Sequence, residues 1–169
     1  MAKQWMPAFA QSGASPPDAK TTNYTIKLVR FRVVREPGAP RTRQTPLSTP
    51  SAVAALAAQL IPDAREHFGV LMLDAQNRLV VYHGVFTGTL SASLVHPREV
   101  FGPALRVMGV ASIILVHNHP SGEPTSSRED LRLTKQLVEA GKLLDITVHD
   151  HVIVGADGAY VSFADRGLL

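Results

Sequence analysis

Residues 112–116 (Ser-Ile-Ile-Leu-Val) constrain the fold most, because they form a short apolar run rich in β-branched side chains. Such a run predicts a strand that is buried on both faces, as in a sheet covered by helices. Pro120 and Gly122 end the predicted strand, and Pro124 keeps the chain irregular until a helix begins near Ser127. The sequence therefore predicts a buried strand, a polar loop and a helix in direct succession.

Two histidines follow this apolar run. His117 and His119 are two residues apart, so in an extended segment their side chains point to the same side, while Asn118 points to the other. Asp130 lies in the first turn of the predicted helix and could supply a third ligand. Three protein ligands with an open fourth position are typical of a hydrolytic zinc site.

Each part of this pattern also has a simpler explanation. The spacings Ser127-x-x-Asp130 and Ser126-x-x-Glu129 both fit a capping box, which satisfies free N–H groups at a helix start. A His-x-His pair at the end of a strand is often only partly exposed and binds nothing. The two histidines, the turn residues and the spacing to Asp130 together favour a metal site.

A second pair, His149 and His151, flanks Asp150 at the start of another apolar run. This pair could form a second metal site. We expect a structural or orienting role instead, because a ligating imidazole commonly donates its other N–H to a carboxylate such as Asp150. The remaining histidines, His67, His83 and His96, fit no pattern and are expected at the surface or in ordinary packing.

The pattern His-x-His-Pro-x-Gly followed by Ser-x-x-Asp resembles the JAMM motif of JAB/MPN-type metalloproteases, and His-Asn-His-Pro-Ser-Gly is similar to their bacterial RadC branch. The likeness covers residues 60–169 and includes the segments 65–74, 88–90, 96–100, 150–155 and 162–168. It implies an α/β/α sandwich and one zinc ion per chain held by His117, His119 and Asp130. One departure is Ser126, where RadC-like sequences usually have proline.

The same resemblance implies roles for two further residues. Glu66 would act as general base on the attacking water and later as general acid to the leaving amine. Ser127 would help to stabilise the oxyanion. A glutamate before an apolar strand is otherwise usually a solvated boundary residue, and nothing local to Glu66 indicates more. Asn118 and Ser121 are expected to shape the loop, and the loops around 84–94 to form the substrate groove.

The rest of the chain predicts an α/β fold. The expected elements are a helix over 50–61 capped by Thr49, strands over 67–73 and 78–86 joined by a turn, helices over 97–108 and 128–143, and strands over 146–154 and 159–163. This order predicts a single domain in which helices sandwich a mixed β-sheet. The core is expected to include Val100, Phe101, Ala104, Leu105 and Met108 of one helix and Leu131, Thr134, Leu137, Val138 and Gly141 of the next.

The first 48 residues differ in composition from the rest. We expect residues 1–23 to be a disordered tail, residues 24–48 to be a basic strand and a linker, and residues 49–169 to be the RadC-like domain. Residues 1–45 contain eight Lys and Arg but two acidic residues. Lys27, Arg30 and Arg32 could therefore contact nucleic acid phosphates weakly, although a basic edge strand also resists aggregation. No apolar run is long enough for a signal peptide or a membrane span.

From the residues and the resemblance together, we expect a zinc metallohydrolase that cleaves an amide or isopeptide bond in a peptide or protein. The sequence contains no cysteine, which excludes thiolate ligands and fits a cytoplasmic protein. RadC-like proteins often carry a helix-hairpin-helix region, for which residues 1–48 leave no room, so we expect a short form. The alternatives are a non-catalytic MPN-type module that binds DNA or a DNA-repair partner, and metal-dependent cleavage of phosphoesters.

Overall fold

The computed structural model describes residues 46–61, 65–88 and 95–169. The predicted tail, the basic strand with Lys27, Arg30 and Arg32, and most of the linker lie outside these residues. The described elements are α1 (Pro50–Leu60), β1 (His67–Leu73), β2 (Leu79–Thr87), α2 (Pro97–Ala104), β3 (Ser112–Asn118), α3 (Arg128–Leu144), β4 (Thr147–Val154), the short 3₁₀ helix η2 (Ala156–Gly158) and β5 (Tyr160–Ser162). No helix among the described residues is long and apolar enough to cross a membrane.

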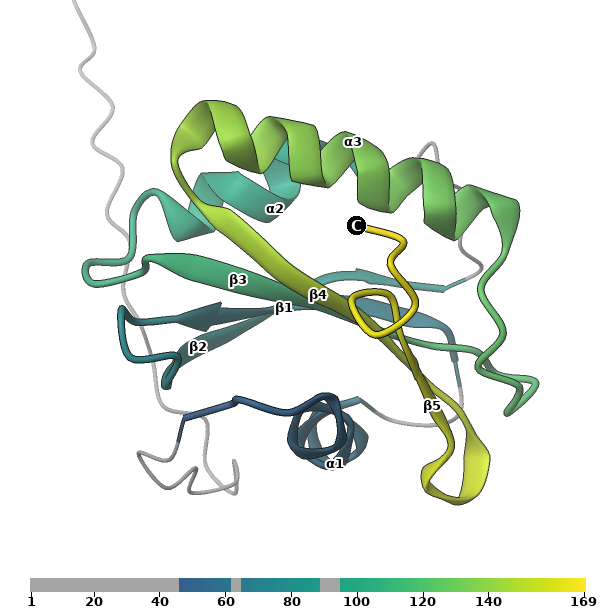
Figure 1. The fold of residues 1–169 in the computed structure, drawn as a ribbon. Helices are drawn as coiled ribbons and strands as arrows, with labels where there is room; N and C mark the ends of the chain where they lie inside the picture. The colour runs from purple at the N-terminus through teal and green to yellow at the C-terminus, as the bar shows by residue number, and fades with distance from the viewer. Residues whose placement is uncertain (1–45, 62–64, 89–94) are drawn as a thin grey trace, which may run out of the picture. The chain divides into compact units, whose positions relative to one another are not determined.

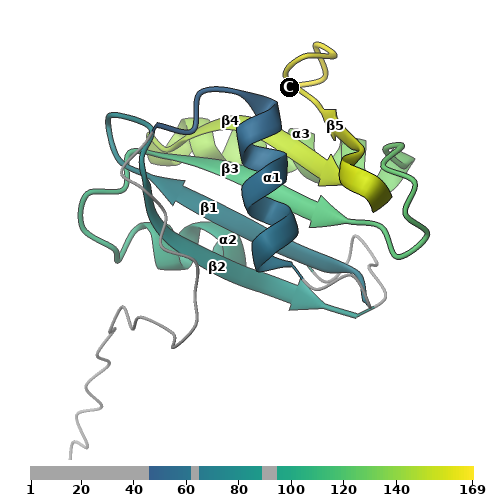
Figure 2. The same ribbon diagram turned by 90° about the horizontal axis from the view of Figure 1, so that it is seen from below.

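The five strands form one mixed sheet in the order β2-β1-β3-β4-β5. Only the β3–β4 pair is parallel, and the connection between these two strands contains α3. Helix α1 covers one face of the sheet, and α2 and α3 cover the other (Figures 1 and 2). The predicted α/β fold, a mixed sheet between helices, is therefore confirmed.

Alternating side chains of the central strands pack into two separate cores. Ile113 and Leu115 of β3 pack in the cluster that includes α2 and α3, whereas Ile114 and Val116 pack in the cluster that includes α1. Because both faces are covered, every residue of β3 is buried, as the apolar run predicts. The same alternation places His117 on the α3 face and Asn118 on the α1 face.

Most predicted boundaries agree with the structure, and the largest difference is at α2. This helix ends at Ala104, and Leu105 and Met108 are 58% and 94% exposed, so their expected place in the core is wrong. Pro103 lies in the last turn and has no N–H to donate to the carbonyl of Glu99, which weakens this short helix near its end. Gly109 then takes a positive φ of 87°, which turns the chain toward β3.

The buried face of α3 also differs from the prediction by one position. Leu131 is 36% exposed, whereas Leu133 is buried along with Thr134, Leu137 and Gly141. This face begins with the buried side chain of Asp130. Compared with the predicted orientation, α3 is rotated about its axis so that the carboxylate of Asp130 is buried. The periodicity of apolar residues does not predict this rotation.

Candidate metal centre

Four of the predicted site residues meet at the carboxyl end of β3. His117 is the second-to-last residue of that strand, His119 is in the following loop, and Asp130 is in the first turn of α3. Glu66 directly precedes β1, which pairs antiparallel with β3 so that His67 lies opposite Asn118. Glu66 is therefore brought to the histidines by strand pairing across 51 residues of sequence.

Asn118 fixes the backbone on both sides of Glu66. Its Oδ1 accepts a hydrogen bond of 2.7 Å from the N–H of His67, and its Nδ2 donates one of 3.0 Å to the carbonyl of Arg65. Asn118 thus points away from the imidazoles, as the strand alternation predicts. Its amide holds the carboxylate-bearing residue in place.

His119 is oriented by the loop that follows it. Its Nδ1 lies 2.7 Å from the carbonyl oxygen of Glu123, which can only accept, so the proton is on Nδ1. In the neutral ring the lone pair is then on Nε2, which lies 3.6 Å from Asp130 Oδ2. This neighbouring carboxylate raises the pKa of His119, more than burial lowers it.

His117 lies between two carboxylates. Its Nε2 is 3.2 Å from Glu66 Oε1, and its Nδ1 is 3.5 Å from Asp130 Oδ1. Burial lowers the pKa of His117, although the charge of Asp130 opposes this effect. A neutral imidazole has one N–H and one nitrogen lone pair, so its unprotonated nitrogen faces a carboxylate oxygen.

Asp130 takes part in the capping box and also faces the imidazoles. Its Oδ2 accepts hydrogen bonds of 2.7 Å from both the N–H and the hydroxyl of Ser127, and Ser127 Oγ accepts from the N–H of Asp130. Burial would raise the pKa of Asp130, but the interactions with His119, His117 and Ser127 hold it far below its ordinary value. The helix cap is Ser127 and not Ser126. The hydroxyl proton of Ser127 therefore points at Asp130 in this structure.

The donor set fits a divalent cation. Among the described residues, Glu66, His117 and His119 form the only group of three potential ligands whose donor atoms all lie within 4.8 Å of one another. Asp130 is outside this group, although it lies beside both imidazoles. His117 Nδ1 is buried and has no hydrogen-bond partner among the described residues. A cation would satisfy the unpaired nitrogen atoms and balance the carboxylates, and such nitrogen and oxygen ligands suit zinc.

Comparison with known proteins identifies the family. The family model described as RadC-like JAB domain matches residues 47–168. The chain belongs to the RadC-like JAB domain family. It is 45% identical over 161 residues to a UPF0758 protein of Syntrophotalea carbinolica, covering 95% of this chain and 68% of that protein.

Other relatives are matched over a smaller share of their length. A UPF0758 protein of Geotalea uraniireducens is 52% identical over 105 residues, covering 62% of this chain and 45% of that protein. A UPF0758 protein of Symbiobacterium thermophilum is 48% identical over 128 residues, covering 75% and 54%. The chain thus spans about half the length of most of these relatives, and their names state no activity.

The second histidine pair of the RadC-like domain does not converge. The pairing of β3 with β4 shifts between Ile113 and Ile114, where Val148 and Asp150 are the partners and His149 bulges out. His149 is exposed, whereas His151 is fully buried with its ring 5.7 Å from that of His117. These two residues therefore do not share a site.

Asp150 does not orient groups at the candidate metal centre. Its carboxylate accepts hydrogen bonds from the N–H of His151, the hydroxyl of Ser162 and the N–H of Ala164. It thus attaches the C-terminal segment to β4. On β4, the residue that lies beside the candidate metal centre is His151, whose ring is 5.7 Å from that of His117. The sequence pattern did not show which of Asp150 and His151 would lie there.

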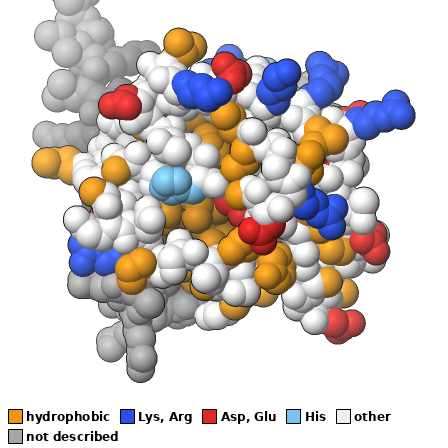
Figure 3. Space-filling view, viewed as in Figure 1, with side chains coloured by type: hydrophobic (Ala, Val, Ile, Leu, Met, Phe, Trp, Pro, Cys, Tyr) orange, Lys and Arg blue, Asp and Glu red, His pale blue; other side chains and the backbone are white. Residues whose placement is uncertain are grey.

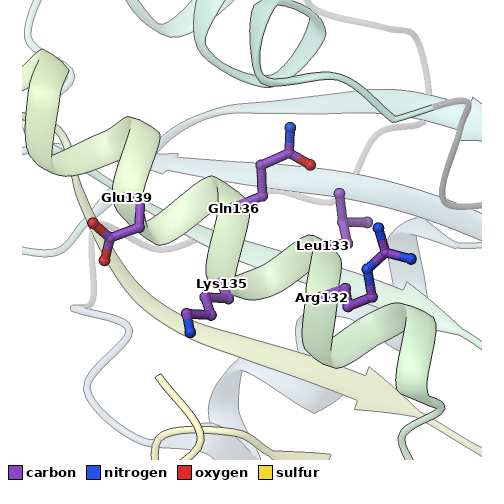
Figure 4. A pocket seen from close by; sticks show the side chains of 5 residues that line it. All are labelled: Arg132, Leu133, Lys135, Gln136 and Glu139. Atoms are coloured by element: carbon purple, nitrogen blue, oxygen red, sulfur yellow. The ribbon is translucent and has the colours of Figure 1, made fainter.

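Two pockets of the RadC-like domain lie away from the four candidate residues. One of about 480 Å³ lies along α3 and is lined by Arg132, Leu133, Lys135, Gln136 and Glu139 (Figure 4). Lys and Arg side chains gather over α3 on the face shown in Figure 3. The other, of about 340 Å³, lies between the start of α1 and the bulge at His149. None of Glu66, His117, His119 and Asp130 lines either pocket.

Proposed function

We propose that this RadC-like domain is a zinc-dependent hydrolase that cleaves amide or isopeptide bonds in peptides or proteins. The observation that carries this proposal is the convergence of Glu66, His117, His119 and Asp130 at the end of β3. In the proposal, His117, His119 and Asp130 hold one zinc ion per chain. Ser127 donates two hydrogen bonds to Oδ2 of Asp130, which would hold this carboxylate in its orientation beside the imidazoles.

In the proposed hydrolysis, the bound ion, Glu66 and Asn118 would have separate roles. When bound, the ion would polarise the scissile carbonyl and make a water molecule more acidic. Glu66, whose side chain is 17% exposed, is placed to take a proton from the attacking water and to give it to the leaving amine as the C–N bond breaks. Asn118 keeps Glu66 at this position through the backbone of its two neighbours.

Ser127 has a structural role in addition to its proposed catalytic one. Its hydroxyl donates to Asp130 and caps α3, so it must turn away from Asp130 before it can donate to an oxyanion. In the observed structure, Ser127 orients the carboxylate of Asp130 through the hydrogen bonds from its N–H and its hydroxyl. Stabilisation of the oxyanion would be a second role during the reaction.

The first test is metal content, measured by elemental analysis of untagged protein. The wild type and Glu66→Gln should contain about one zinc per chain, whereas His119→Ala and Asp130→Ala should contain none. Asp130→Ala also breaks the capping box, so Ser127→Ala is the matched control. That variant loses the cap but keeps the ligand, and it should retain zinc.

Activity is tested on peptide and isopeptide substrates with the same variants. Hydrolysis by the wild type should stop when a chelator is added, and Glu66→Gln should be inactive while it keeps its metal. A wild-type protein that neither contains zinc nor takes it up would refute the proposal of a zinc-dependent hydrolase. A zinc-loaded but inactive wild type would favour the non-catalytic binding module.

A further inference from the structure

A second buried polar pair lies directly behind the candidate metal centre. Thr134 of α3 and His151 of β4 are both 0% exposed. Thr134 Oγ1 lies 2.6 Å from the backbone carbonyl oxygen of Asp130 and 2.6 Å from His151 Nδ1. The His151 ring stacks at 24° to the ring of His117. The pair thus contacts both elements that carry the proposed ligands.

The hydrogen bonds determine where the protons are. The Thr134 hydroxyl has one proton, and the Asp130 carbonyl can only accept, so that proton goes to Asp130. Thr134 Oγ1 must then accept from His151, which places a proton on Nδ1 and the lone pair on Nε2. The His151 ring is 0% exposed, and such burial disfavours its charged form. This tautomer leaves a buried acceptor, and not an N–H, without a partner among the described residues.

The resulting chain of hydrogen bonds links two elements of the fold. It runs from the His151 ring through the Thr134 hydroxyl to the carbonyl of Asp130. His151 lies opposite Leu115 in the parallel pair of β4 with β3, two positions before His117. A shift of α3 along β4 would break the hydrogen bond between Thr134 and His151, which is the bond that joins the two elements.

We propose that Thr134 and His151 are positioning residues that hold the Asp130 carboxylate at its place beside His117. This inference rests on the proposed function, because it concerns ligands of the same metal centre. Neither residue contacts the substrate or the metal in the proposal. Their effect is on the affinity of the site, since a metal ion binds best when its ligands are held in place before it arrives.

A simpler explanation gives both residues a packing role only. A threonine inside a helix often donates to the carbonyl four residues earlier without any further partner. The His151 ring also contacts Phe68 and Phe163, as an ordinary core side chain would. The two explanations differ in whether zinc affinity depends on the hydroxyl and the ring nitrogen or on packing.

The test uses three variants and two measurements. Thr134→Val removes the hydroxyl but keeps the shape, Thr134→Ser keeps the hydroxyl but loses a methyl group, and His151→Phe keeps an aromatic ring. Zinc affinity is measured by competition with a chromophoric chelator, and unfolding by urea is measured on the metal-free protein. Thr134→Val and His151→Phe should bind zinc about 10- to 100-fold more weakly than the wild type. Thr134→Ser should bind like the wild type although it unfolds at lower urea.

A packing role would give a different order, in which zinc affinity follows folding stability across the three variants. That order, or wild-type affinity in Thr134→Val and His151→Phe, would overturn the inference while leaving the proposed function intact. A wild type that takes up no zinc would overturn both. The ¹⁵N shifts of the imidazoles give a readout without metal: His151 should be protonated at Nδ1, and a proton on Nε2 would contradict the inference.

Discussion

The substitution Gly155→Ala tests how the loop after β3 is held. The backbone of Gly155 has φ −114° and ψ −166°, which alanine adopts without strain. A Cβ at this position would instead clash with the carbonyl oxygen of Gly122 and lie 2.8 Å from Pro124 Cδ. Carbon atoms pack at about 3.5–4.0 Å, so the loop would have to move by roughly 1 Å.

This movement has two expected costs. It strains or breaks the 2.8 Å hydrogen bond from the N–H of Ala156 to the carbonyl of Gly122. Overpacking and the weakened hydrogen bond together should lower the free energy of unfolding by about 2–4 kcal/mol. The shift also moves the Glu123 carbonyl that holds His119 Nδ1, so zinc affinity should fall about 10- to 100-fold.

Urea unfolding of the metal-free protein and chelator competition for zinc measure the two effects. Gly158→Ala is the matched control, because Gly158 is in the same β4–β5 connection and no described atom lies within 4 Å of its added Cβ. Gly158 has φ +78°, so that variant should lose roughly 1–2 kcal/mol of stability but keep its zinc affinity. Equal zinc affinities in Gly155→Ala and Gly158→Ala would refute the idea that this contact positions His119.

Three further predictions concern buried polar groups. Asp150→Ala should lower the free energy of unfolding in urea by about 3–5 kcal/mol, because three donors, two of them buried, lose their acceptor. Asp150→Asn, which keeps one oxygen, should lose about 1–2 kcal/mol. Asn118→Leu should keep zinc in elemental analysis but lower kcat by up to about 100-fold, because Glu66 is displaced; an unchanged kcat would contradict this positioning role. Metal-free protein should lose stability as the pH falls from 6.5 toward 3, by up to about 1.4 kcal/mol per pH unit from His151, because the unfolded imidazole binds a proton that the folded one does not. Urea titrations at several pH values check this, and His151→Phe should show a shallower loss.

Much of the fold could be predicted because its signals are local. The observed β1 spans His67–Leu73 as predicted, and α1 begins after the predicted cap at Thr49, which accepts from the N–H of Ala52. The apolar run of β3 indicated a strand covered on both faces, and α1 and α3 cover it. The predictions for Leu105, Met108 and Leu131 were wrong because an apolar side chain does not reveal which surface its helix packs against.

The candidate site divides in the same way. The spacing of His117 and His119 and the capping box of Ser127 and Asp130 are local patterns, and the structure contains both. The approach of Glu66 to His117 is not local. It depends on antiparallel pairing between strands that are far apart in the sequence. The metal ligands and the roles of Glu66 and Ser127 stay predictions until metal binding is measured.

The sequence by itself determined the order of elements, the covered sheet and the polar loop that follows its central strand, because these follow from backbone periodicity and turn chemistry. Only the tertiary structure decided that α3 buries Asp130 beside two imidazoles. It likewise decided that a bulge leaves the His149 side chain exposed while that of His151 is buried. It also decided that Thr134 meets His151. These contacts depend on strand register and helix rotation, which are set by packing between distant segments and leave no pattern within either segment.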